Sequence, residues 1–237
     1  MKKKEKVIPY LFIAPWFIGM ILFILGPLVM SFIMSFYDWP VIGERVFVGI
    51  GNYVELFTKD DQFYKSLYIT FKFTLFFVPF NIIIALILAV LISKNLKFIS
   101  VFRVIFYLPT VVSSVAVSII WGWILNTEFG ILNYGLSVFD VLGPDWLNSE
   151  LWALIALVIV SGWTVGTMML VFYTALKGIS VDIYEASIID GSGPINTFFK
   201  ITLPLITPTL LFNTVTAIIG ALQNLALVLL LTNGGPL

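Results

Sequence analysis

The chain has 237 residues, of which 60% are hydrophobic and 11% are charged, and its 13 basic residues balance its 13 acidic ones. An ordinary soluble domain carries about 25% charged residues, so this composition excludes one and indicates an integral membrane protein. Neither Cys nor His occurs, which excludes disulfides, thiolate metal sites and a histidine base. No GxxxxGK[ST] motif for cradling ATP phosphates occurs either. We therefore expect no catalytic residue, no metal site and no cofactor.

Uncharged runs long enough to cross a bilayer, which takes about 20 residues, recur along the chain. They cover residues 7–37, 73–93, 104–127, 151–176 and 201–237. Because lipid offers the backbone no hydrogen-bond partners, these runs should be helices. The first run follows several lysines but is too long for a signal peptide, and no small-residue cleavage site follows it. The predicted fold class is an all-α integral membrane protein with five transmembrane helices.

The basic residues divide unevenly between the segments that connect these runs. Nine of the 13 lie in segments that are cytoplasmic if the N-terminus is cytoplasmic, namely Lys2, Lys3, Lys4, Lys6, Lys94, Lys97, Arg103, Lys177 and Lys200. The segment 128–150, on the other side, contains acidic residues and no basic one. Because Lys and Arg accumulate in cytoplasmic loops, the sequence predicts a multi-pass protein with its N-terminus inside and its C-terminal end outside.

Glycine and proline residues indicate kinks, close contacts and ends in several of the runs. Pro15, Gly19, Gly26 and Pro27 predict kinks in the first run. Gly162 and Gly166, in the fourth, have the small-xxx-small spacing that permits close helix contact in lipid, and ordinary packing is the simpler interpretation of it. The last run should stop at the glycines of residues 232–236.

A polar loop separates the fourth run from the fifth. Ile183, Ala186 and Ile189 recur at three-residue spacing while the acidic residues lie elsewhere around a helix, which predicts a short amphipathic surface helix. Ser180 is suited to cap its start, and Gly191 to end it. Taken alone, such a segment is most simply a connecting loop whose carboxylates are solvated at the membrane surface.

The order of residues in this loop resembles a known motif. Tyr184-Glu185-Ala186-Ser187, Asp190-Gly191 and Ile201-x-Leu203-Pro204 are similar to the EAA loop of bacterial binding-protein-dependent ABC permeases of the carbohydrate-uptake class. In that family the loop is a coupling helix that docks into a groove of a separate ATPase. The resemblance implies an ABC importer permease fold, one transmembrane permease domain over 1–237 and a cytoplasmic coupling loop at 180–204. The coupling residues that it implies are Tyr184, Glu185, Ala186, Ser187, Asp190, Gly191, Ile201, Leu203 and Pro204.

The chain departs from the family pattern at two positions of this loop. Ser187 stands where the motif usually has a second alanine, which is a small-for-small change. Pro194 stands where the family often has a bulkier residue, so the second turn of the loop is expected to differ in shape.

Further similarity to sugar-type permeases covers nearly the whole chain. It includes Phe47-Val48-Gly49 with Asn52-Tyr53, Arg103 through Tyr107-Leu108-Pro109, and the Gly-Gly-Pro turn at 234–236. The likeness is strongest to glycerol-phosphate, lactose and maltose permease subunits, which normally continue past this turn into a sixth span. The chain stops at the turn, so we expect a fragment or truncated product that lacks the final span.

The resemblance implies a non-enzymatic subunit of an ATP-driven importer for a sugar or related polyol in the bacterial cytoplasmic membrane. The implied partners are a second permease subunit in a heterodimer, cytoplasmic ABC ATPase subunits, an extracytoplasmic solute-binding protein and the lipid bilayer, with no nucleic acid. The alternative is an ion-coupled secondary transporter of a small polar solute. No ionisable side chain lies within the five runs, which disfavours proton coupling but leaves sodium sites built from carbonyls open.

Amide side chains in or near the runs are the candidates for the substrate path. Asn81, Asn213, Gln223 and Asn224 can pair with sugar hydroxyls, although amides in membrane helices more often bond a neighbouring helix. Gln223 and Asn224 are the foremost of the four. The sequence does not indicate which sugar they would meet.

Overall fold

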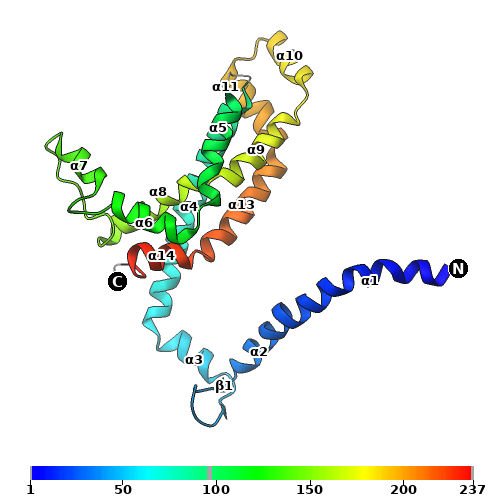
Figure 1. The fold of residues 1–237 in the computed structure, drawn as a ribbon, viewed down its shortest axis with the longest axis vertical. Coiled ribbons are helices and arrows are strands. Elements are labelled where there is room, and N and C mark those ends of the chain that lie inside the picture. The colour runs from blue at the N-terminus through cyan, green and yellow to red at the C-terminus, as the bar shows by residue number, and fades with distance from the viewer. Residues whose placement is uncertain (1, 95–97, 236–237) are drawn as a thin grey trace. The chain divides into compact units, whose positions relative to one another are not determined.

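The computed structural model describes residues 2–94 and 98–235, with side chains from residue 9 onward (Figure 1). The predicted cytoplasmic cation Lys97 and the last two residues, including the proline of the Gly-Gly-Pro turn, lie outside the described residues. The chain divides into two compact units, Met1–Leu67 and Tyr68–Leu237. The expectation of a single permease domain over 1–237 stays a prediction.

The first unit opens with a long apolar helix. It consists of α1 (Lys2–Met20), a π-helical turn η1 (Ile21–Leu25) and α2 (Gly26–Met34). The π turn directly precedes Pro27, which cannot donate to the carbonyl four residues back, so the backbone accommodates the missing bond by widening one turn. Gly26 accordingly donates to the Ile21 carbonyl, five residues back. The kink predicted at Gly26 and Pro27 therefore takes the form of a π turn.

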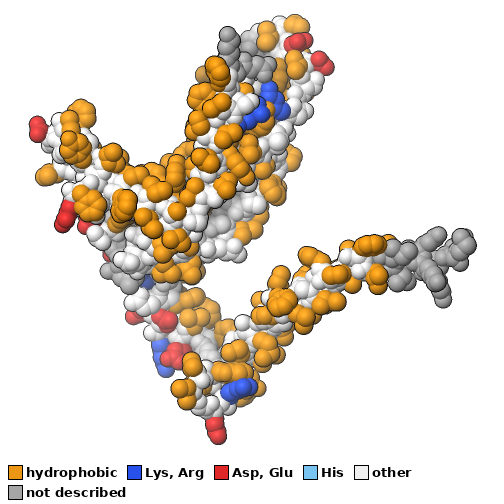
Figure 2. Space-filling model, in the orientation of Figure 1, with side chains coloured by type: hydrophobic (Ala, Val, Ile, Leu, Met, Phe, Trp, Pro, Cys, Tyr) orange, Lys and Arg blue, Asp and Glu red, His pale blue; other side chains and the backbone are white. Residues whose placement is uncertain are grey.

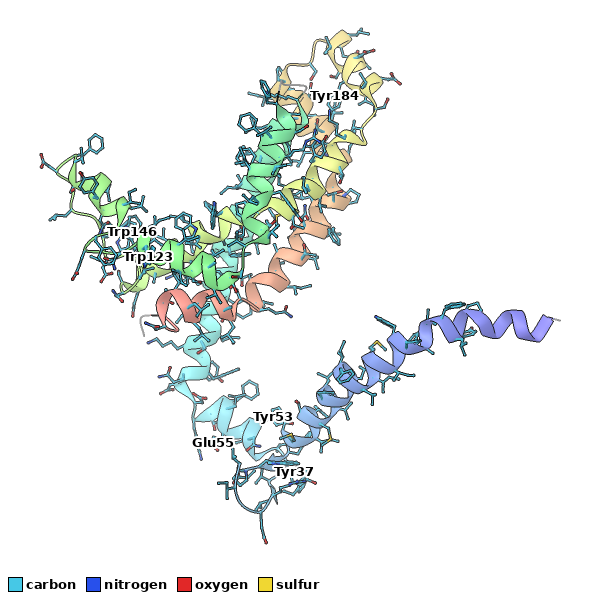
Figure 3. All side chains as sticks on the ribbon, in the orientation of Figure 1. Tyr37, Tyr53, Glu55, Trp123, Trp146 and Tyr184 are labelled. Carbon is cyan, nitrogen blue, oxygen red and sulfur yellow. The ribbon has the colours of Figure 1, made fainter. Side chains whose placement is uncertain are left out.

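A short antiparallel strand pair and a short helix follow α2. β1 (Tyr37–Asp38) pairs antiparallel with β2 (Val46–Phe47), and α3 (Gly51–Thr58) follows. The Asn52 amide donates to the carbonyls of Ser35 at 2.9 Å and Tyr37 at 3.0 Å, and the Tyr53 hydroxyl lies 2.7 Å from Ser35 Oγ (Figure 3). These bonds connect α3 to Ser35 at the end of α2 and to Tyr37 of β1.

Bent helices form the second unit. In chain order they are α4 (Asp61–Ser93, which begins in the first unit), α5 (Ile99–Tyr107), the 3-10 turn η2 (Leu108–Val111), α6 (Ser114–Ile124), α7 (Ile131–Ser137), α8 (Glu150–Trp163), α9 (Gly166–Lys177), α10 (Val181–Ile189), α11 (Pro194–Thr197), the π turn η3 (Phe198–Thr202), α12 (Leu203–Leu205), α13 (Thr207–Leu222) and α14 (Leu225–Thr232). The two short strands of the first unit are the only strands among the described residues. The all-α fold class is therefore confirmed.

The second predicted span is the later part of a longer helix. α4 begins at Asp61 rather than at residue 73. Asp60 caps this end, because its Oδ1 accepts from the Phe63 amide at 3.1 Å. Hydropathy marks only the lipid-buried part of a helix, and this helix continues through the charged stretch that contains Lys65 and Lys72.

The later predicted spans are not single straight helices. Bends of 101°, 52° and 72° separate α5–η2 from α6, α8 from α9, and the segment Pro194–Leu205 from α13. A further break at Gln223 and Asn224 divides α13 from α14. Two helices of the described part are long and apolar enough to span a membrane, or up to five if each bent pair counts as one span. The number of five spans stays a prediction.

Two apolar clusters hold the second unit together, one on each side of the α8–α9 bend. The first packs Ala156 and Val160 of α8 against α6 and α14. The second packs Met169 and Phe172 of α9 against α4, where Ala89 is fully buried. Most other apolar side chains are exposed and cover the outside of the helices, whereas the charged ones gather near their ends (Figure 2). An apolar exterior of this kind fits lipid as the surrounding solvent.

The predicted outer loop between α6 and α8 is fixed by hydrogen bonds around Asn133 and Asp145. Trp146 Nε1 donates to Asn133 Oδ1 at 2.7 Å (Figure 3). The Asp145 carboxylate accepts from the Thr127 hydroxyl at 2.9 Å and from the Asn148 amide at 3.0 Å. These hydrogen bonds, the one from Thr127 foremost, stabilise the charged form and hold the pKa of Asp145 below its ordinary value. The loop thus has a defined structure at neutral pH.

Candidate functional site

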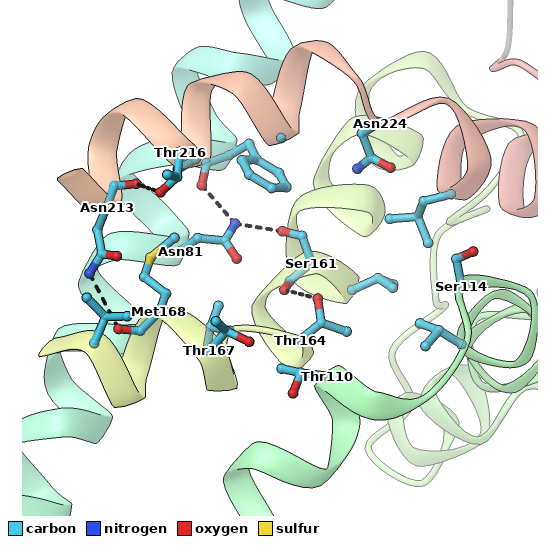
Figure 4. A pocket seen from close by; sticks show the side chains of 18 of the residues that line it. Asn81, Thr110, Ser114, Ser161, Thr164, Thr167, Met168, Asn213, Thr216 and Asn224 are labelled. Carbon is cyan, nitrogen blue, oxygen red and sulfur yellow. Dashed lines mark hydrogen bonds between the residues drawn. The ribbon is translucent and has the colours of Figure 1, made fainter. Parts of the chain in front are cut away.

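A pocket of about 520 Å³, lined by apolar side chains together with amides and hydroxyls, opens where the helices of the second unit bend (Figure 4). Residues from α4, η2, α6, α8, α9, α13 and the α13–α14 break line it. Its polar lining residues are Asn81, Thr110, Ser114, Ser161, Thr164, Thr167, Asn213, Thr216 and Asn224. No charged side chain of the described residues lines it, and Phe77 and Phe212 contribute aromatic faces. Amides, hydroxyls and aromatic faces suit a neutral, hydroxyl-rich ligand.

The pocket contains a hydrogen-bonded group around Asn81. The Asn81 amide nitrogen donates to Ser161 Oγ and to the Phe77 carbonyl, both at 2.8 Å. Ser161 in turn donates to the Val158 carbonyl at 2.6 Å, and Thr164 Oγ1 donates to the Ser161 carbonyl at 3.0 Å. Both donors of Asn81 are thus used, which leaves its carbonyl oxygen as an acceptor.

The second buried amide of the pocket is less firmly bound. Asn213 donates to the Met168 carbonyl over 3.4 Å, longer than the usual N–H···O range of about 2.7–3.2 Å. Its backbone carbonyl accepts from Thr216 Oγ1 at 3.0 Å. The Asn213 side chain therefore keeps capacity to bond a ligand.

The structure brings three of the four predicted substrate-path residues to this pocket. Asn81, Asn213 and Asn224 line it. Gln223 does not; it ends α13 as an exposed C-cap residue, so the choice of Gln223 as a foremost candidate has no support from its position. The chain turns between these two neighbours, and only Asn224 faces the pocket.

The hydroxyl residues of the pocket were missed in the sequence. Ser161, Thr164 and Thr167 follow each other at three-residue spacing across the α8–α9 bend, and Asn213 and Thr216 are similarly spaced on α13. Residues three apart share one face of a helix, so a polar stripe inside an apolar run was the signal that could have found them.

Both glycines of the predicted small-xxx-small pair permit close contacts, as expected. A Cβ on Gly162 would lie 2.7 Å from Phe80 Cε1, and a Cβ on Gly166 would lie 2.7 Å from the Phe106 carbonyl oxygen. The pair does not sit on one continuous helix, because the chain bends at Thr164 and Val165 between them. The glycines thus let α4 and α5 approach opposite sides of the bend.

The predicted coupling loop forms α10 and the turn after it. Ser180 caps the helix as expected, since its Oγ accepts from the Asp182 amide at 3.3 Å. Gly191 ends it with φ of +73°, a left-handed conformation that favours glycine. α11 then starts at Pro194, whose fixed φ suits a first helical position.

The side of α10 that faces the rest of the chain differs from the predicted one. Ile183, Ala186 and Ile189 are all exposed, Ile189 by 85%, whereas Ser187 is buried. Tyr184, three residues before Ser187, lies on the same side (Figure 3). The three-residue spacing of the apolar side chains predicted the helix correctly, but the apolar face that they form is exposed.

Hydroxyl groups tie α10 to the start of the last helices. Ser187 Oγ donates to the Tyr184 carbonyl at 2.8 Å and lies 3.4 Å from Thr197 Oγ1, which donates to Ser192 at 3.0 Å. Thr202 Oγ1 donates to the Tyr184 hydroxyl at 3.3 Å. The Ser187 hydroxyl therefore makes hydrogen bonds that the alanine usual at this position of the motif cannot make.

The remaining predicted coupling residues lie where the loop meets solvent or the last helices. Glu185 and Asp190 are exposed, and Ile201, Leu203 and Pro204 belong to η3 and α12. α10 thus offers an exposed surface with acidic and apolar side chains at one end of the second unit (Figure 2).

A bundle of bent apolar helices around an uncharged pocket, with a polar helix at one end, is the architecture of a membrane permease. The family described as "Binding-protein-dependent transport system inner membrane component" matches residues 81–237. The chain is 34% identical to the probable ABC transporter permease protein YesP of Bacillus subtilis, over 99% of this chain and 77% of that protein. It is 32% identical to the trehalose/maltose transport system permease protein MalF of Thermococcus litoralis, over 100% of this chain and 80% of that protein.

The fold is also found in a solved transporter. A chain of a bacterial alginate ABC transporter, crystallised with an alginate pentasaccharide-bound periplasmic protein, superposes with a TM-score of 0.79. The alignment covers 90% of this chain and 72% of that chain at 22% identity. At this identity the likeness shows the fold alone.

The chain belongs to the inner membrane components of binding-protein-dependent transport systems. It is accordingly a multi-pass membrane permease and not an enzyme. The EAA-type resemblance read from residues 184–204 is confirmed at the level of the family.

Proposed function

We propose that the chain is a permease subunit of an ATP-driven importer for a neutral sugar or related polyol. The observation that carries this proposal is the pocket whose polar lining groups are amides and hydroxyls, with no charged side chain from the described part of the chain. Such groups donate to and accept from sugar hydroxyls, whereas a phosphate or carboxylate ligand is normally met by Arg or Lys. The names of relatives such as the trehalose/maltose permease support the same class of substrate.

The energy source in this proposal is a separate ATPase that binds α10. The helix exposes Glu185, Ile188 and Ile189 to solvent, although large apolar side chains are costly to leave in water. A second permease subunit completes the translocation path, and an extracytoplasmic solute-binding protein delivers the sugar. Closure of the ATPases moves α10 and so alternates the access of the pocket.

Copurification and uptake test this function together. The chain, expressed together with its neighbouring genes, should copurify with an ATPase, and the complex should import neutral labelled sugars from a panel in preference to sugar phosphates. An ion-coupled transporter would instead import its solute without the ATPase and follow an ion gradient. Uptake that persists when the ATPase is removed would overturn the proposal.

The proposed topology places the N-terminus and α10 in the cytoplasm. Because the chain has no cysteine, single cysteines report accessibility without background. A cysteine at exposed Asp190 should resist an impermeant maleimide added to intact cells, and a control cysteine at exposed Glu128 should react. Labelling of position 190 from outside the cell would show that the topology is the reverse of the proposed one.

A further inference from the structure

The bend between α8 and α9 is held by one amide on each side. The chain turns by 52° at Thr164 and Val165. On the α8 side, Asn81 of α4 donates to Ser161 Oγ at 2.8 Å. On the α9 side, Asn213 of α13 donates to the Met168 carbonyl at 3.4 Å (Figure 4). Two different helices thus fix the two limbs of the same bend.

These bonds lie where apolar packing is interrupted. One apolar cluster includes Val160 at the end of α8, and the other includes Val165 and Met169 at the start of α9. The pocket occupies the space between the two clusters. α4 packs against both limbs, through Phe77 in the first cluster and Ala85 in the second. The polar bonds of Asn81 and Asn213 across the pocket add a further restraint on the angle between the limbs.

The same two amides face the pocket that would receive the sugar. Asn81 is 3% exposed and Asn213 is 2% exposed, and both are lining residues. Asn81 has both donors committed at short distance, whereas the single bond of Asn213 is long and therefore weak. A sugar hydroxyl in the pocket can replace the Met168 carbonyl as the acceptor of Asn213 at little cost.

The limb that Asn213 holds continues into the helix proposed to bind the ATPase. α9 ends at Lys177 and α10 begins at Val181. The few residues between them, including the capping Ser180, leave little slack. A change in the direction of α9 must therefore move α10.

We propose that Asn81 and Asn213 are positioning residues that brace the α8–α9 bend, and that sugar binding releases α9 by taking over the Asn213 donor. Asn81 remains the fixed point on the α8 side. This assignment rests on the proposed function, since it links the sugar pocket to the ATPase-binding helix. It gives both amides a role beyond contact with substrate.

Hydrogen exchange of the chain in detergent tests the brace without any ligand. Asn213→Ala removes the bond to Met168, so amides of residues 165–172 should exchange about two- to threefold faster, the low end of the effect of losing one hydrogen bond, because this bond is long. The matched control is Thr214→Val, because Thr214 bonds only to the Leu210 carbonyl of its own helix, at 2.7 Å, and does not line the pocket. Exchange in α6 and α14 should stay unchanged in both variants.

ATP hydrolysis by the assembled transporter tests the link to α10. Without sugar or binding protein, Asn213→Ala and Asn81→Ala should raise basal hydrolysis about three- to tenfold, because they imitate release of the bend. Thr214→Val should leave the basal rate of ATP hydrolysis unchanged. Asn213→Gln, which keeps an amide donor, should have a basal rate between those of Asn213→Ala and the unmodified chain. Merely structural damage would lower hydrolysis instead.

The results distinguish failure of the brace at the α8–α9 bend from failure of the proposed transport function. Unchanged exchange in Asn213→Ala overturns the brace, and faster exchange without raised hydrolysis overturns its link to α10. An assembled complex in which the unmodified chain supports no ATP hydrolysis contradicts the proposed function itself.

Discussion

Glu185→Ala should abolish ATP-driven uptake while leaving membrane insertion and affinity for the binding protein intact. Glu185 is exposed on α10, where it is placed to accept a charge-assisted bond from a basic residue of the ATPase, of a kind typically worth about 1.5–3 kcal/mol. Loss of that bond weakens ATPase association by roughly ten- to a hundredfold. The measurement is the yield of copurified ATPase together with the rate of sugar uptake.

The matched control for this change is Asp182→Asn on the same helix. The Asp182 carboxylate is also exposed but is engaged by the Ser180 hydroxyl at 3.1 Å, and an asparagine keeps an acceptor there. It should copurify with the ATPase nearly as well as the unmodified chain. Full uptake and normal copurification of Glu185→Ala would show that this carboxylate is only solvated.

Gly191→Pro should have the same outcome through the backbone. Gly191 adopts φ of +73°, and its amide donates to the Ile188 carbonyl at 3.0 Å. Proline fixes φ near −65° and has no amide hydrogen, so it removes both the turn and the bond. Gly193→Ala is the control, because Gly193 has φ of −74° and no atom within 4 Å of a built Cβ. Equal uptake by both variants would exclude a mechanical role for the turn.

Gly166→Ala should strongly destabilise the second unit. Its added Cβ would meet the Phe106 carbonyl oxygen at 2.7 Å and Tyr107 Cα at 2.8 Å, and backbone atoms cannot rotate away as a side chain can. Overpacking of this kind typically costs about 1–3 kcal/mol. The midpoint of thermal unfolding in detergent should therefore fall by several degrees, roughly as expected for such a loss in a domain of this size.

Gly122→Ala separates this clash from the general effect of replacing a helical glycine. The nearest atom to a Cβ on Gly122 is Leu231 Cδ1 at 3.9 Å, an ordinary contact. Its midpoint should stay the same or rise slightly, because alanine favours helix more than glycine does. A Gly166 variant as stable as the Gly122 variant would mean that α5 does not pack against the bend as the structure shows.

The membrane class and the approximate position of the apolar helices could be read from the sequence, whereas the bends could not. Hydropathy depends on composition, and both limbs of α8–α9 are apolar, so their average does not distinguish one straight span from a bent one. Residues Thr164 and Val165 at the bend include no proline. The bend depends instead on tertiary contacts of Asn81 and Asn213, which lie far away in the sequence.

The candidate site was predictable in its amides and not in its hydroxyls. A Ser or Thr in a membrane helix often bonds its own backbone, as Ser118 does to the Ser114 carbonyl at 2.8 Å, so its presence alone indicates no site. Gln223 and Asn224 were equivalent in the sequence, and only the break after α13 separates the exposed one from the lining one. The helix α10 was predicted from the spacing of its residues, whereas its buried side depends on Tyr184 and Ser187 bonding to neighbouring segments.

The arrangement of α9 between a bend and α10 has a simple geometric consequence. A helix of 12 residues extends for about 18 Å at 1.5 Å per residue. A rotation of roughly 10° about the bend then carries the far end by roughly 3 Å, while atoms one turn from the bend move by only about 1 Å. The pocket thus lies beside the fulcrum of a lever and α10 lies at its tip. A displacement at the pocket is therefore magnified about threefold at α10.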